Sequence, residues 1–196
     1  MGVSLLVAGL MSLTVTSCCH RHEMPKPYAY PRLTYPSKGF QTFNAPDKTY
    51  QFEYPATFVP TLDKSSLPKG RWVDFRFERY GITLFTSYLQ TANKASLNEQ
   101  IDRHEALLQK KIPPYSTIQK IGINQPDKSL SVYLYEISGN SATPFEFLIT
   151  DNHNRFFSGN VLFDEVPDRD SLADVLNGLS KDMLHLMKTF RFRKPS

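Results

Sequence analysis

The sequence predicts an α/β fold of the α+β kind, in which a mostly antiparallel sheet is flanked by two helices. From Tyr50 onward, several short segments alternate apolar and polar residues, as half-buried strands do. Two longer segments, near residues 96–112 and 168–188, carry apolar residues at helical spacing instead. The 14 phenylalanines and 10 tyrosines supply apolar material for a core and for strands.

The first strands are predicted from Tyr50 to Tyr54 and within residues 71–89. The alternation of residues 50–54 stops at Pro55. In residues 71–89, Val73, Phe75 and Phe77 alternate with polar or aromatic neighbours, so one face is apolar. We expect a hairpin here, with Tyr80-Gly81 in its turn, because glycine adopts a positive φ without strain.

A helix is predicted next, from Ser96 to the pair Pro113-Pro114. Ser96 and Glu99 have the spacing of a capping box, and the two prolines end the helix. One face carries Leu97, Ile101, His104 and Leu108. A catalytic role for His104 is one interpretation, but a lone histidine on an apolar face is more often a packed, hydrogen-bonded residue.

Three further strands are predicted after this helix, at residues 130–135, 145–149 and 156–163. Asp151 to Asn154 have the composition of a turn, so the last two strands should form a hairpin. We expect His153, which lies in that turn, to be exposed.

A final helix is predicted to begin between Asp168 and Ser171. Its apolar stripe consists of Leu172, Val175, Leu176, Leu179, Met183, Leu186 and Met187. His185 falls between the stripe positions, and we expect it to be exposed. Residues 189–192 could form a short last strand. This order of elements resembles the α/β/α sandwich of the PsbP and Mog-type proteins, in which a short strand follows the final helix.

The first 17 residues are typical of a lipoprotein signal peptide. They carry no charge, and their apolar run is shorter than the roughly 20 residues that span a bilayer. Val15-Thr16-Ser17-Cys18 resembles a bacterial lipobox, which makes Cys18 the predicted lipidation site. Met1 to Ser4 lack the Lys or Arg that normally opens a signal peptide, so we expect the true start to lie upstream.

A disulfide and a zinc site are two other interpretations of this cysteine region. Adjacent Cys18 and Cys19 cannot easily form a disulfide with each other, because the bond needs a specific geometry. A zinc site with His20 and His22 would need a second pair of ligands, and no further cysteine follows residue 19. The rest of the chain therefore has no disulfide framework.

The predicted organisation is a signal peptide at 1–17, a lipidated Pro-rich tether and arm at 18–48, and one globular domain at 49–196. Five prolines between residues 25 and 46 favour extended geometry in the arm. Its aromatic residues are too numerous for a free linker. Part of the arm either packs on the domain or serves as a docking strip for a partner.

Charge and motifs exclude several classes of function. The net charge of +4 is spread along the chain without a run of five like charges, so nucleic-acid binding is not indicated. Asp74 and Glu78 were considered as a hydrolytic pair on one strand face, and Asp151 with His153 as a second. No Gly-rich phosphate loop, HExxH or GxSxG accompanies them. We expect no enzyme activity, no cofactor and no metal.

Four motifs in order give a closer resemblance, to the gliding-motility lipoprotein GldD family of Bacteroidetes. They are the arm Pro25-Lys26-Pro27 to Pro36, Phe52-Glu53-Tyr54-Pro55, the central stretch from Tyr135 to Phe147, and the segment from Asp170 to Phe190. Ala29 replaces a common glycine of the arm.

The resemblance implies an envelope lipoprotein, bound to the membrane by its N-terminal lipid and facing the periplasm. It implies a non-enzymatic role in gliding motility and the associated type IX secretion machinery, through protein–protein interaction. The CBS-domain membrane protein GldE is the expected partner, and the family supplies no catalytic residues. The alternative is a periplasmic small-ligand-binding lipoprotein with a PsbP-like fold.

The candidate partner surface consists of Arg32, Gly139 and Asn140. Arg32 lies in the arm, and Gly139-Asn140 lie in the connection between two predicted strands. Loops on a rigid scaffold often carry binding residues. The simpler alternative is that Gly139-Asn140 only form a tight loop.

Overall fold

The structure, a computed structural model, describes residues 34–36, 39–62, 71–125, 129–168 and 170–193. Residues 32–196 form one compact unit. The predicted signal peptide, Cys18 and Arg32 lie outside the described residues.

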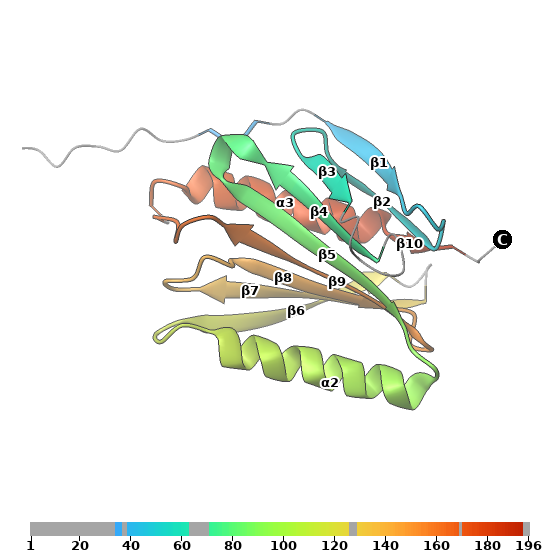
Figure 1. Cartoon of the computed structure of the whole chain (residues 1–196). Coiled ribbons are helices and arrows are strands. Elements are labelled where there is room, and N and C mark those ends of the chain that lie inside the picture. The colour runs from blue at the N-terminus through green and yellow to red at the C-terminus, as the bar shows by residue number, and fades with distance from the viewer. Residues whose placement is uncertain (1–33, 37–38, 63–70, 126–128, 169, 194–196) are drawn as a thin grey trace, which may run out of the picture. The chain divides into compact units, whose positions relative to one another are not determined.

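A seven-stranded antiparallel sheet is the centre of this unit (Figure 1). Its strand order is β3-β4-β5-β9-β8-β7-β6. The strands are β3 (Val59–Leu62), β4 (Trp72–Phe77), β5 (Ile82–Gln90), β6 (Thr117–Gln125), β7 (Leu130–Ser138), β8 (Phe145–Thr150) and β9 (Arg155–Phe163).

A smaller sheet joins segments from the two ends of the unit. Its order is β1-β2-β10, from β1 (Phe40–Asn44), β2 (Tyr50–Pro55) and β10 (Arg191–Phe192), and both pairings are antiparallel. Helix α3 (Ala173–Thr189) leads directly into β10. The predicted short last strand is therefore confirmed.

The main core lies between the large sheet and a layer made of α3 and the small sheet (Figure 1). Apolar residues at alternate positions of the strands meet there, because successive side chains of a strand point to opposite faces. The most enclosed side chains include Phe52, Phe75, Phe157 and Phe190, each less than 2% exposed. Phe190 packs against the rings of Tyr50, Phe52 and Phe157.

Helix α2 (Lys94–Lys111) covers part of the opposite face of the large sheet. Leu97 and Leu108 of this helix form a second apolar cluster with Tyr135, Ile137, Leu148 and Phe156. These partners lie on β7, β8 and β9, so the outer face of β4 and β5 is left largely without a helix over it. The resulting order of layers is helix, large sheet, then helix with small sheet.

These features confirm the predicted fold class and most predicted elements. The strand at 50–54, the hairpin at 71–89, the strands after α2 and both helices are present. β1, β3 and β6 were not predicted. β1 falls inside the segment expected to be tether and arm, and its Phe43 is buried in the main core. β3 and β6 occupy the two edges of the large sheet, where less burial leaves a weaker apolar alternation.

The predicted N-cap of the first helix was wrong by three residues. α2 begins at Lys94, and its N-cap is Asn93, whose side chain accepts a hydrogen bond from the Ser96 amide at 2.9 Å. Ser96 supplies only its backbone amide to this cap. Ser96 and Glu99 have the spacing of a capping box, but they lie one turn inside the helix. Asn93 has the extended backbone that an N-cap requires. The predicted end before Pro113 is confirmed, with Ile112 as C-cap.

The hairpin turn is confirmed with one difference in form. Residues Glu78–Tyr80 form a 3₁₀ turn, and Gly81 closes it with φ of 59°. Glu78 therefore lies outside β4, and its carboxylate is 3.4 Å from Arg76 Nε. Asp74 and Glu78 thus do not share the strand face that the sequence had suggested.

Candidate functional sites, a sheet groove and a loop end

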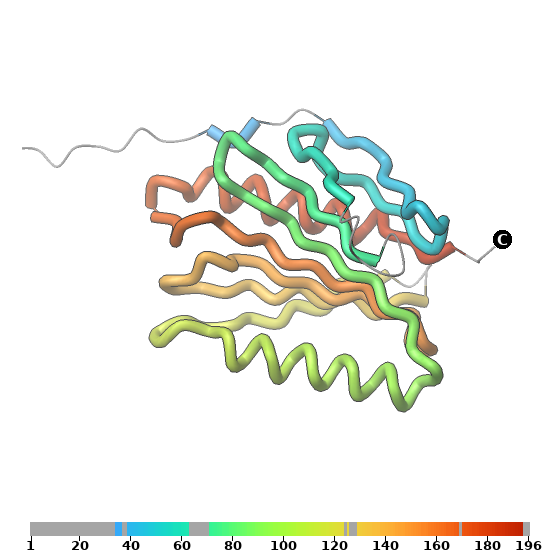
Figure 2. Tube along the Cα trace, viewed as in Figure 1, coloured from blue at the N-terminus to red at the C-terminus, as the bar shows by residue number. Residues whose placement is uncertain are grey.

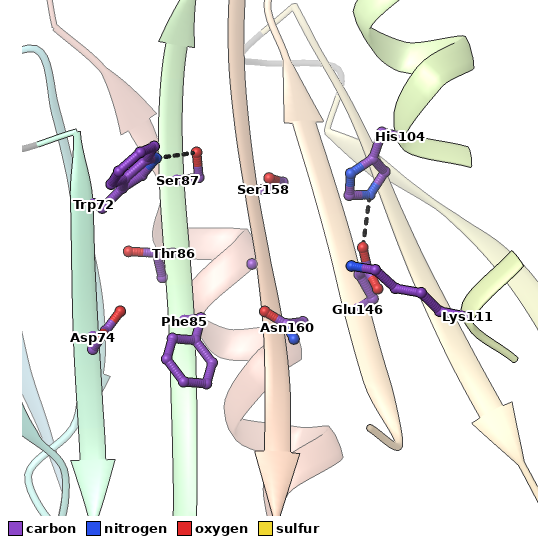
Figure 3. Close-up of a pocket in the computed structure, with 11 residues that line it drawn as sticks. Trp72, Asp74, Phe85, Thr86, Ser87, His104, Lys111, Glu146, Ser158 and Asn160 are labelled. Carbon is purple, nitrogen blue, oxygen red and sulfur yellow. Dashed lines mark hydrogen bonds and ion pairs between the residues drawn. The ribbon is translucent and has the colours of Figure 1, made fainter. Parts of the chain in front are cut away.

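One cavity is an open groove beside α2, here called the sheet groove (Figure 3). It has a volume of about 400 Å³, and its polar and aromatic lining is Trp72, Asp74, Phe85, Thr86, Ser87, His104, Lys111, Glu146, Ser158 and Asn160. β4 forms one side, β5, β8 and β9 form the floor, and α2 forms the other side. The groove exists because α2 covers only one half of this sheet face.

His104 and Glu146 meet at the α2 side of the groove. Nε2 of His104 is 3.2 Å from Oε1 of Glu146, and each side chain is 13% exposed. The two atoms are within ion-pair range but are not aligned as a hydrogen bond. The His104 ring also packs edge-on against Phe156. The packing expected of His104 is therefore present, and the carboxyl group of Glu146 is its polar neighbour.

Burial sets the charge of this pair. Burial lowers the pKa of His104, and Lys111 lowers it further while Glu105 opposes the shift. Burial also raises the pKa of Glu146, against the effect of Lys111. Both shifts favour the neutral forms, because a low dielectric disfavours charge. The neighbouring Glu105 is held by Lys120 and by the Tyr135 hydroxyl, each at 2.6 Å, and these hydrogen bonds lower its pKa.

The second site is one end of the large sheet, here called the loop end. It comprises the turn at 78–81, the connection at 112–116, the loop at 139–144 and, from the connection before α3, residues 164–168 and 170–172 (Figure 2). Backbone hydrogen bonds connect three of these segments. Asp164 N–H donates to Gly81 O at 2.8 Å, and the N–H of the preceding residue, Phe163 at the end of β9, donates to Ala142 O at 2.9 Å. The loop end is therefore a connected surface rather than a set of independent loops.

The arm reaches this same end of the sheet. The Tyr80 hydroxyl donates to the carbonyl of Thr34 at 2.7 Å. Tyr35 follows, packs against the main core, and donates a hydrogen bond from its hydroxyl to Asp182 of α3. The sequence left open whether the arm packs on the domain or serves as a docking strip. Thr34 and Tyr35 pack on the domain. Arg32 itself lies outside the described residues.

Gly139 and Asn140 lie where the sequence predicts, in the loop between β7 and β8. Gly139 has φ of 99°, and a Cβ there would lie 2.8 Å from Ser116 Oγ and 2.9 Å from Tyr115 O. This loop is thus packed against the α2–β6 connection. Asn140 is exposed, so the loop combines a constrained glycine with an accessible amide.

Tyr115 is the most exposed large side chain at the loop end, and sequence reasoning missed it. Its exposed fraction is 102%, and its φ is 64°. A non-glycine residue with positive φ is uncommon, and such strain tends to persist where surrounding structure holds it. The sequence does contain a signal for an exposed ring at this position, because Tyr115 directly follows Pro113-Pro114, where the predicted helix ends and a short connection begins.

A comparison with protein families decides what kind of protein this is. The family model described as "Gliding motility lipoprotein GldD" matches residues 20–192. The chain belongs to this family. The match spans both helices and both sheets. Cys18 lies before its first residue, so lipidation at Cys18 stays a prediction. The family description names a motility lipoprotein and no catalytic activity.

Two further comparisons were with curated proteins and with solved structures. No curated protein matches the chain. The solution structure of cyanobacterial PsbP (CyanoP) from Synechocystis sp. PCC 6803 is similar, with 12% identity and a TM-score of 0.42. The match covers 82% of this chain and 98% of that one.

Asp151 and His153, the other candidate pair, have structural roles in a turn. His153 is exposed, as predicted. Asp151 is buried; its Oδ1 accepts the amides of His153, Asn154 and Arg155, and its Oδ2 accepts Arg155 Nε at 2.6 Å. Burial raises the pKa of Asp151, but these hydrogen bonds outweigh burial and lower it. Asp151 shapes the turn and does not activate His153.

The prediction for His185 was wrong. It is half-buried; its Nε2 lies 2.6 Å from Glu53 Oε2, and its ring stacks on Phe40 with centroids 3.7 Å apart. The small sheet extends over this flank of α3, and the sequence did not predict β1, which supplies Phe40.

Neither a metal site nor a membrane span is present in the described part of the chain. No group of three or more His, Cys, Asp or Glu residues is arranged to hold a metal ion among the residues described. Within those same residues, no helix has the length and apolar character to cross a bilayer.

Proposed function

We propose that this protein is a non-enzymatic lipoprotein of the cell envelope that supports gliding motility through protein–protein contacts. The observation that carries the proposal is the family match over residues 20–192, whose description names a gliding-motility lipoprotein. The finer statements are also proposals: lipidation at Cys18, a periplasm-facing domain, and a link to the type IX secretion machinery and to the membrane protein GldE.

The loop end is the contact surface that we propose. It places the exposed amide of Asn140 and the fully exposed ring of Tyr115 on neighbouring segments. Aromatic residues are enriched at protein interfaces, and the hydrogen-bonded frame limits the conformational entropy lost on binding. The arm, which carries Arg32, enters at the same end through Thr34. A membrane-tethered partner could therefore contact arm and loops together.

The first experiment tests the surface. A photoreactive residue in place of Asn140 should crosslink to membrane proteins in intact cells. A photoreactive residue in place of Tyr115 should give a crosslink as well. Adding Asn140→Asp or Arg32→Glu to that Tyr115 variant should abolish its crosslink and leave the melting temperature unchanged. Crosslinks that persist in both charge variants would rule out the loop end as the contact surface.

A matched control comes from the other end of α2. Asn98 is also exposed, and it lies 14 residues before Ile112, or roughly 20 Å along the helix axis. Asn98→Asp makes the same chemical change outside the loop end. It should leave both crosslinking and melting temperature unchanged.

The second experiment tests the role in the cell. Depletion of the protein should reduce colony spreading and the secretion of type IX cargo, and re-expression of the unchanged chain should restore both. Normal spreading and secretion in depleted cells of a gliding strain would refute the proposed function.

A further inference from the structure

The sheet groove lies outside the loop end and has the dimensions of a ligand site. Its volume of about 400 Å³ falls within the range of roughly 300–1,000 Å³ that is common for small-molecule sites. A second cavity of about 240 Å³ shares Lys111, Glu146 and Asn160 with it, so the hollow continues along the sheet beneath the end of α2. A chain-like ligand could therefore extend beyond the main groove.

The polar groups of the groove differ in kind from one strand to the next. Asp74 lies on β4, Ser87 on β5, Ser158 and Asn160 on β9, and Glu146 on β8, while Lys111 extends from α2 (Figure 3). Carboxylates accept hydrogen bonds, an ammonium group donates them, and amides and hydroxyls do both. A ligand with several hydroxyl groups matches this set, because every hydroxyl is donor and acceptor at once.

Trp72 adds an aromatic wall to the groove. It is the only tryptophan in the chain, and 54% of it is exposed. Its Nε1 donates to Ser87 Oγ at 3.2 Å, which fixes the indole against the neighbouring strand. Phe85 lies on the same strand as Ser87 and also lines the groove. An exposed, oriented indole offers an apolar face to the C–H face of a sugar ring while its polar edge is already satisfied.

Other ligand classes fit these residues less well. A phosphate would lie beside the carboxyl oxygens of Asp74 and Glu146, which mainly offer it acceptors where it needs donors, while Lys111 in the same lining offers an ammonium group. A wholly apolar ligand would bury Ser158 and Asn160 without hydrogen-bond partners, which is costly. A peptide strand needs a sheet edge, and this groove lies on a sheet face between β4 and α2.

We infer that the sheet groove binds a saccharide, with Trp72 stacking on a sugar ring and Asp74, Asn160 and Glu146 pairing with its hydroxyl or amide groups. This inference goes beyond the proposed function. The residues that line the sheet groove itself lie outside the loop end, and of the two cavities only the second reaches loop-end residues, namely Ile112, Ser141 and Thr143. Failure of the groove experiment leaves the crosslinking result at Asn140 unaffected, and the reverse also holds.

Calorimetric titration of the full chain, purified in a detergent without a sugar headgroup, tests the inference. One probe is a tetramer of β-1,4-linked N-acetylglucosamine, and the other is maltotetraose. We expect one of them to bind with 1:1 stoichiometry. A preference for the first indicates an N-acetylated glycan of the peptidoglycan type, and a preference for the second indicates a neutral glucan.

Variants place the binding in the groove. Trp72→Ala and Asp74→Asn should each weaken binding by about tenfold, a factor that one good polar or aromatic contact supplies. Phe40→Ala removes another exposed aromatic ring, on the small sheet at the opposite side of the large sheet, and should leave the affinity unchanged. Melting temperature confirms that each variant is folded. The inference is overturned if neither saccharide binds, or if Trp72→Ala binds as tightly as the unchanged chain.

Discussion

Gly139 is restricted by two independent features, its backbone angle and its neighbours. A φ of 99° disfavours any residue with a Cβ, and the closest atoms to an added Cβ belong to Ser116 and Tyr115. The glycine was predicted from the sequence for the first reason alone. The second reason depends on the α2–β6 connection, which only the folded chain brings to this loop.

Replacing Gly139 with valine should therefore lower the melting temperature. The expected cost is about 1–3 kcal/mol for a strained φ, and each kcal/mol shifts the melting temperature by roughly 2–4 °C in a domain of this size. Thermal unfolding followed by circular dichroism measures the change. Gly122→Val is the matched control, because a Cβ at Gly122 has no atom within 4 Å and valine suits a strand. Equal melting temperatures for the two variants would contradict this account of Gly139.

His104 should make the free energy of unfolding depend on pH, and a single substitution can separate its contribution from those of other groups. Its pKa is lowered by burial, whereas in the unfolded chain a histidine titrates near 6.5. Below that pH the unfolded chain takes up a proton that the folded chain resists. The stability linked to neutral His104 is present above the unfolded pKa and is lost as the pH falls towards the lowered folded pKa.

The variant His104→Gln removes this titration. Its free energy of unfolding should change less than that of the unchanged chain as the pH falls from about 7 to about 5. Urea unfolding at a series of pH values measures the difference, and Glu146 titrates in both proteins. Parallel pH profiles would show that His104 does not resist protonation in the folded state.

At the scale of elements, helix α2 shows how a sequence pattern can be right in kind and wrong in position. The apolar spacing identified the helix and the face that carries Leu97 and Leu108. Its first turn was ambiguous, because Asn93 and Ser96 are both good capping residues. The packing of Leu97 against the sheet fixes the helix in the register that makes Asn93 the cap.

Alanine substitution distinguishes the two caps directly. Asn93→Ala should lower the free energy of unfolding by about 0.5–2 kcal/mol, because the Ser96 amide loses its acceptor. Ser96→Ala should have little effect, since the helix cap uses the backbone of Ser96. Urea unfolding measures both variants. A larger loss for Ser96→Ala would restore the capping box predicted from the sequence.

At the scale of the whole molecule, the class of fold followed from the sequence but the pairing of its layers did not. Alternation in β2, β4, β7, β8 and β9, together with two apolar helix stripes, was sufficient for an antiparallel sheet with two helices. The second sheet could not be predicted, because it joins segments separated by some 140 positions. The groove was equally hidden, since Asp74, His104 and Glu146 share no local pattern and meet only when α2 covers half of a sheet face.

The N-terminal lipid can be tested independently of this fold. One acyl chain, at about 0.8 kcal/mol per buried CH₂, binds a membrane only marginally, so stable anchoring needs more than one. Cys18→Ser should remove the labelled lipid and release the protein from the membrane fraction. Cys19→Ser is the matched control and should leave both unchanged. Retention of the unlabelled Cys18→Ser protein in the membrane fraction would refute lipid anchoring at this position.

The pairing of β10 with β2 has a consequence for how the chain acquires its structure. Tyr50 and Phe52 pack on Phe190, so the main core stays incomplete until residues 190–192 are available. Contacts of such long separation form late, because loop closure costs entropy before the contact compensates for it. A chain that emerges gradually, from a ribosome or through a translocation pore, would hold β2 exposed until α3 and β10 follow. We therefore expect the small sheet to complete the main core last, once α3 and β10 have both emerged.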